Sequence, residues 1–154
     1  MNGLKFSTPA PMQANGRLSM KILIVDDDTV SREILRKIIV ARTTHQVTVA
    51  ENGTAGWALL DDPSRYFDVA FLDLTMPPPD GFELLQRIRR SPLLSAVEVV
   101  LCTGSNDRAT IAKAIQLGAR HYIVKPCGEA VVLAKLQQIR PAESAAAERT
   151  VAGA

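Results

Sequence analysis

The sequence predicts an α/β protein in which helices cover both faces of a parallel β-sheet. Short apolar runs rich in β-branched residues recur along the chain, as is typical of strands that are buried on both faces. Stretches with apolar residues at helical spacing separate these runs. Such strict alternation favours one parallel sheet with right-handed crossovers. A doubly wound order, 2-1-3-4-5, is one possibility that the alternation alone does not select.

Ten elements are expected along residues 20–140. In order they are strand 21–26, helix 29–42, strand 46–50, a helix from Asn52-Gly53 to about Asp62, strand 68–73, helix 82–88, strand 97–102, helix 107–117, strand 121–124 and helix 129–139. Asp28 is an N-cap candidate for the first helix, because aspartate at that position accepts hydrogen bonds from free backbone N–H groups. Gly118 is a natural left-handed stop after the helix 107–117.

The expected helix 29–42 carries an apolar stripe. Four apolar residues recur at helical spacing along it: Val30, Ile34, Ile38 and Ala41. We expect this stripe to face the core.

The segments on either side of residues 20–140 differ from it in composition. Residues 1–19 contain Pro, Ser and Asn-Gly in a pattern typical of linkers, so we expect a flexible extension. Residues 141–154 follow a proline and are rich in Ala and Glu, which favours a flexible or partly helical tail. The remaining 20–140 form a single domain.

Composition excludes several classes of function. The formal net charge is +2, and it comes from Lys5 and Arg17, because the acids and bases of residues 20–139 balance. We therefore expect no direct DNA binding. No apolar run approaches the ~20 residues that span a bilayer, and no secretory signal is seen. Cys102 and Cys127 do not make a disulfide framework, which suits free thiols in the cytoplasm.

The apolar runs end in residues that carry chemistry. Asp26 and Asp27 follow the first run, and the later ones end at Asp73, Thr103 and Lys125. The carboxyl ends of parallel strands are where open α/β sheets bind ligands. Crowded carboxylates repel one another, so a divalent cation with oxygen ligands is the simplest neutralising partner.

Four motifs at these strand ends resemble the receiver domain of bacterial two-component response regulators, of the stand-alone chemotaxis or phosphorelay type. They are Ile24-Val25-Asp26-Asp27-Asp28, Leu72-Asp73-Leu74-Thr75-Met76-Pro77 with Asp80-Gly81, Leu101-Cys102-Thr103-Gly104, and Tyr122-Ile123-Val124-Lys125-Pro126. The resemblance covers about 20–139. It implies a flavodoxin-like, doubly wound five-stranded sheet of order 2-1-3-4-5 with five helices.

The resemblance also implies roles for individual residues. Asp73 would be the phosphoacceptor, and Lys125 would pair with it, before a Lys125-Pro126 peptide that is commonly cis in the family. Mg²⁺, or Mn²⁺ in its place, would be held by Asp26, Asp27, Asp73 and the main-chain carbonyl of Thr75. A hard cation and an ammonium would reduce the repulsion between the attacking carboxylate and the phosphoryl oxygens.

Thr103 and Tyr122 would form the conformational switch in such a domain. Thr103 would donate its hydroxyl to a phosphoryl oxygen, and Tyr122 would turn inward as Thr103 moves. The upstream partner would be a histidine kinase or a histidine phosphotransfer protein. A downstream protein would bind the helix 107–117, the strand 121–124 and the helix 129–139, and the protein would be a monomer or weak dimer without a membrane partner.

Two other classes of function remain open. Phosphatases of the haloacid dehalogenase type also use a nucleophilic aspartate with Mg²⁺, but they place a second aspartate two residues on, where this chain has Thr75. A phosphorylation-independent scaffold with the same fold is the other class. The presence of Asp73, Thr103 and Lys125 argues against it. The leading expectation is a phosphoacceptor that assists its own phosphorylation and dephosphorylation and turns over no separate substrate.

Overall fold

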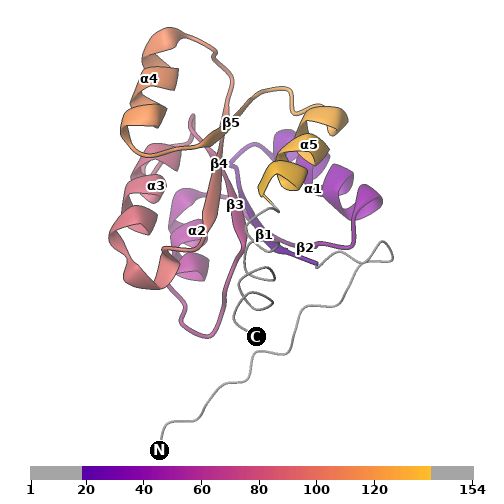
Figure 1. The fold of residues 1–154 in the computed structure, drawn as a ribbon, viewed down its shortest axis with the longest axis horizontal. Coiled ribbons are helices and arrows are strands. Elements are labelled where there is room, and N and C mark those ends of the chain that lie inside the picture. Colours follow the sequence, from indigo (N-terminus) through magenta and orange to yellow (C-terminus); the bar gives the residue numbers. More distant parts are fainter. Residues whose placement is uncertain (1–18, 140–154) are drawn as a thin grey trace, which may run out of the picture.

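The computed structural model describes residues 19–139, in which strands and helices alternate as expected (Figure 1). Their bounds are β1 Lys21–Val25, α1 Thr29–Arg42, β2 Gln46–Ala50, α2 Gly53–Leu60, β3 Val69–Asp73, α3 Gly81–Arg90, β4 Glu98–Thr103, α4 Arg108–Gln116, β5 His121–Val124 and α5 Glu129–Ile139. A short 3₁₀ turn, η1 Pro92–Leu94, was not expected. Apart from Ser19, the predicted extension and tail lie outside the described residues. Ser19 is buried, and its Oγ donates to the carbonyl oxygen of Thr44 at 2.7 Å.

The strands form one parallel sheet of order β2-β1-β3-β4-β5, which confirms the doubly wound topology. Because all strands run the same way, the ends of β1, β3, β4 and β5 meet at one edge. Within the described residues, no helix is both long and apolar enough to cross a membrane.

Alternate residues of each strand enter two separate cores. Leu23 and Val25 of β1 point into a core that α2 and α3 cover, whereas Ile22 and Ile24 point into a core that α1 and α5 cover. Figure 1 shows these two helical layers on opposite sides of the sheet. Each fully buried Leu or Ile contributes about 1.5–3 kcal/mol of transfer free energy, so both layers hold the sheet.

The expected core face of α1 was wrong except at Ile38, which is partly buried and packs against the core that α1 and α5 cover. Val30 and Ile34 are 65% and 45% exposed, and Ala41 is exposed as well. Leu35 and Ile39 are the residues that the helix buries. This helix carries apolar residues on more than one side, and spacing alone does not say which stripe faces the sheet. Packing against both β1 and α5 selects the stripe.

The helix termini agree with the sequence signals. Asp28 caps α1, and its side chain accepts a hydrogen bond from the backbone N–H of Ser31 at 2.9 Å. Gly118 follows α4 with φ +86°, the left-handed conformation that glycine adopts at little cost.

Candidate functional site

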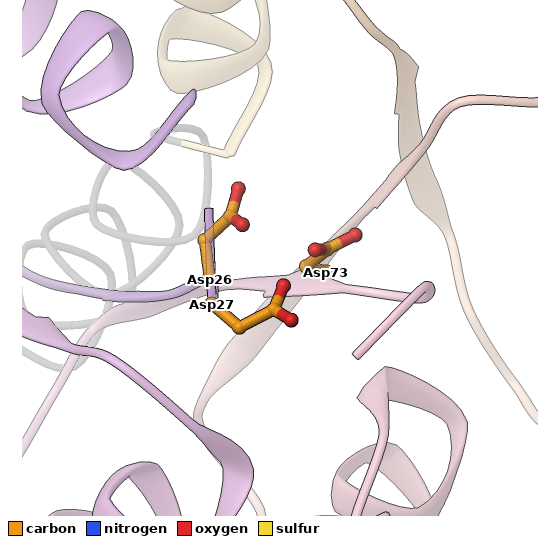
Figure 2. Close-up of side chains that lie close together, drawn as sticks. All are labelled: Asp26, Asp27 and Asp73. Atoms are coloured by element: carbon orange, nitrogen blue, oxygen red, sulfur yellow. The ribbon is translucent and has the colours of Figure 1, made fainter. Parts of the chain in front are cut away.

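Three carboxylates lie together at the carboxyl ends of β1 and β3 (Figure 2). One oxygen from each of Asp26, Asp27 and Asp73 lies within 4.8 Å of the others. Asp26 and Asp73 are only 5% and 2% exposed, whereas Asp27 is exposed. The apolar strands bury two of the acids and leave the third exposed. The cluster is therefore shielded from solvent on one side and open to it on the other.

Lys125 reaches this cluster from the end of β5. Its Nζ lies 2.9 Å from Oδ2 of Asp26 and 3.4 Å from Oδ2 of Asp73. The sequence pointed to a pairing with Asp73, and the structure adds a shorter contact with Asp26. The Lys125–Pro126 peptide is cis, in agreement with the resemblance. One ammonium therefore bridges the two buried acids.

The pKa values of Asp26 and Lys125 depend on their burial and on the contact between them. Burial raises the pKa of Asp26, while the hydrogen bonds from Lys125 and from the backbone N–H of Asp28 oppose that rise. Burial alone would lower the pKa of Lys125, but its contacts with Asp26 and Asp73 outweigh burial and raise it. Lys125 therefore stays an ammonium at neutral pH.

The donor set fits a hard divalent cation. Three carboxyl groups and one ammonium lie together in a small, partly open space. Carboxylate oxygens are the ligands that Mg²⁺ prefers, and it commonly binds through one or two of them while keeping several waters. The exposed side at Asp27 leaves room for such waters.

Thr75 holds the second buried acid from the other side. Its backbone N–H and its Oγ1 donate to Oδ1 of Asp73, at 3.1 and 3.0 Å. Asp73 is thus fixed by Thr75 at one oxygen and by Lys125 at the other. Fixing both oxygens restricts the carboxylate to one orientation.

Gly81 is a positioning residue that the sequence did not single out by itself. A Cβ placed on it would lie 2.6 Å from the carbonyl oxygen of Asp73, closer than real Cβ atoms approach. The first turn of α3 therefore packs directly on the backbone that carries the acid. The Asp80-Gly81 pair was the available signal, although a turn was its simpler explanation.

Arg32 is a second contact that sequence reasoning missed. Its guanidinium donates to the backbone carbonyl of Asp26 at 2.8 Å and so ties α1 to the end of β1. A contact with a backbone carbonyl leaves no trace in the sequence pattern, and Arg32 looked like an ordinary polar-face residue.

Thr103 and Tyr122 lie near the site without joining it. Thr103 is buried, yet its hydroxyl donates to the carbonyl oxygen of Ser105 at 2.9 Å and accepts from the Ser105 N–H at 3.0 Å. Tyr122 is 41% exposed. The sequence-predicted residues are thus divided: the acids and Lys125 are assembled, whereas Thr103 bonds to Ser105 and Tyr122 is exposed.

Comparison with known proteins agrees with this geometry. Residues 22–137 match the family model described as the response regulator receiver domain. A protein of Rhizobium etli described as "Probable chemotaxis protein CheY" is 32% identical over 107 residues, which are 70% of this chain and 81% of that protein. A receiver domain protein from Methanospirillum hungatei has a similar structure, with a TM-score of 0.73 and 25% identity over 82% of this chain and 97% of that one.

A larger relative contains a similar segment. The 3',5'-cyclic-nucleotide phosphodiesterase regA of Dictyostelium discoideum is 29% identical over 78% of this chain, which spans only 15% of that protein. The match to the family model covers most of the chain, and the sheet order and the strand-end residues agree with it. The chain belongs to the response regulator receiver domain family.

Proposed function

We propose that this protein is a response regulator that accepts a phosphoryl group on Asp73 from a histidine kinase or a histidine phosphotransfer protein. The observation that carries the proposal is the buried Asp73 carboxylate, oriented by Thr75 and Lys125 beside two further acids. This carboxylate lies beside an ammonium and two further acids that could hold a cation. Both positive charges would reduce the repulsion between the carboxylate and an incoming phosphoryl group.

The transfer follows from these contacts. An oxygen of Asp73 attacks the phosphorus of a phosphohistidine, the P–N bond breaks, and the imidazole leaves with a proton from solvent. Mg²⁺, or Mn²⁺ in its place, would be held by Asp26, Asp27, Asp73 and the Thr75 carbonyl and would neutralise the phosphoryl oxygens. Lys125 sits where its ammonium can pair with the new phosphoryl group.

The signal then passes to the part of the domain that carries Thr103 and Tyr122. The Thr103 hydroxyl exchanges its bonds to Ser105 for a phosphoryl oxygen, and the exposed Tyr122 ring turns inward. Apolar side chains are exposed on α4, β5 and α5, as expected of a surface that binds a protein: Ile115, Tyr122, Val124 and Val131. We place this partner-binding surface on those elements, in a cytoplasmic monomer or weak dimer that signals through protein contacts and not through DNA.

Acetyl phosphate provides a direct test, because it donates a phosphoryl group without a kinase. The full chain is incubated with acetyl phosphate, with and without Mg²⁺, and its intact mass is followed, with Asp73→Asn as the matched control. Stable, Mg²⁺-dependent modification that Asp73→Asn abolishes supports the proposal. Fast turnover of acetyl phosphate without a lasting adduct would instead indicate a hydrolase, and no modification would indicate a scaffold.

A panel of histidine kinases and phosphotransfer proteins then identifies the donor. The cognate donor should transfer its label to the full chain much faster than the others do. Continued labelling of Asp73→Asn by that donor would overturn the assignment of the acceptor.

A further inference from the structure

The two cysteines of the chain lie against each other beside the proposed phosphorylation site. Cys102 is in β4 and 3% exposed, inside the core that α1 and α5 cover. Cys127, which follows β5, is partly exposed and packs against that same core. The two thiols interact, and each shifts the pKa of the other. Both are free thiols, 25 residues apart in the sequence but brought together by the β4–β5 pairing.

Their surroundings make the two thiols unequal. The interaction with Cys102 lowers the pKa of Cys127, and the nearby Lys125 ammonium lowers it further, although burial opposes both. The same interaction, together with burial, raises the pKa of Cys102. A partly exposed thiol with a lowered pKa next to a second thiol suits the pairing of an attacking and a resolving cysteine.

The position of the pair connects it to the site. Cys102 is the register partner of Asp73 across β3 and β4 and directly precedes Thr103. Cys127 follows Lys125 by two residues. A covalent bond between the two sulfurs would therefore tie together the segments that carry Thr103 and Lys125.

We propose that Cys102 and Cys127 are an oxidation site, at which hydrogen peroxide converts the dithiol into an intramolecular disulfide. The Cys127 thiolate attacks one peroxide oxygen, the O–O bond breaks, and the leaving hydroxide takes up a proton to give water and a sulfenic acid on Cys127. The Cys102 sulfur then attacks that sulfenic sulfur, and its proton leaves with the hydroxyl group as a second water. A dithiol reductant reverses the bond.

The consequence for signalling rests on the proposed function. The disulfide holds Thr103 and Lys125 in a fixed relation, and the switch requires Thr103 to leave its own loop. The oxidised protein should therefore accept a phosphoryl group from acetyl phosphate several-fold more slowly than the reduced protein, and reduction should restore the rate.

The test treats the reduced full chain with hydrogen peroxide and follows free thiols by maleimide labelling and intact mass. We expect both thiols to be lost together as one disulfide within the chain, and to return with dithiothreitol. Cys127→Ser should leave Cys102 as a thiol and make phosphorylation insensitive to peroxide. Thiols that stay free, that oxidise to sulfinic or sulfonic acid, or that join two chains would each overturn the proposal.

Asp73→Asn separates this proposal from the function on which its consequence rests. It cannot accept a phosphoryl group at residue 73, but it should still form the disulfide. If the wild-type chain also fails to be phosphorylated while the disulfide forms, the proposed function fails and the oxidation site stands.

Discussion

On one side of the site Asp26 and Asp73 are buried and Lys125 already contacts both. On the other side Thr103 bonds to its own loop and Tyr122 is exposed. We call these the acceptor side and the output side, the latter including α4. The helices differ in the same way: α3 buries Leu84, Leu85 and Ile88, while α4 buries Ala114 alone. Segments with few buried contacts open at low free-energy cost. The difference indicates a pre-formed acceptor and an output surface that is free to move.

The largest effect is expected from a change in the packing of α3 against the backbone of Asp73. Gly81→Ala places a Cβ against the Asp73 carbonyl, so α3 or the end of β3 must shift. We expect a loss of about 1–3 kcal/mol in the free energy of unfolding, measured by urea titration, together with slower phosphorylation.

Gly104→Ala is the matched control on the output side, because no atom lies within 4 Å of a Cβ placed there. It should leave the free energy of unfolding nearly unchanged. Equal losses in the two variants would contradict the packing argument.

Lys125→Met removes the ammonium and keeps most of the side chain's volume. The buried acids lose their counter-charge, so the rate of phosphorylation by acetyl phosphate should fall on the order of tenfold, about 1.4 kcal/mol in the barrier. Lys135→Met, on α5 and away from the acids, is the control and should keep the wild-type rate. An unchanged rate in Lys125→Met would remove Lys125 from the mechanism.

A smaller effect concerns the start of α4 on the output side. Asp107 caps this helix through the backbone N–H of Thr110, and its contacts with Ser105 and Thr110 lower its pKa to about 2. Its contribution to stability is therefore fully present above the ordinary pKa of 3.8 and is lost as the pH falls through about 2. Asp107→Ala should lower the thermal midpoint of unfolding by a few degrees at neutral pH. It should also weaken the protection of the α4 backbone amides against hydrogen exchange.

Asp107→Asn separates the cap from the charge, since asparagine caps helices about as well as aspartate. The thermal midpoint of Asp107→Asn at neutral pH should therefore stay close to that of the wild type. A midpoint as low as that of Asp107→Ala would mean that charge, and not the cap, stabilises this turn.

The sequence predicted one side of the site better than the other for a physical reason. Continuous apolar runs located the strands, and parallel pairing brings their carboxyl ends to one edge, where Asp26, Asp73 and Lys125 lie. The strand order and the pairing of Lys125 with Asp73 were implied by the family resemblance and not by the pattern. The hydroxyl orientation of Thr103 and the exposure of Val30 depend on which of several local contacts is formed, and spacing does not encode that choice.

The most direct test of this account is amide hydrogen exchange on the full chain, with and without phosphorylation by acetyl phosphate and Mg²⁺. We predict that phosphorylation changes exchange in β4, α4 and β5, leaves β1 and β3 nearly unchanged, and has little effect on the output side of Thr103→Ala even when Asp73 carries the phosphoryl group. A change confined to β1 and β3, or an output response that persists in Thr103→Ala, would contradict it.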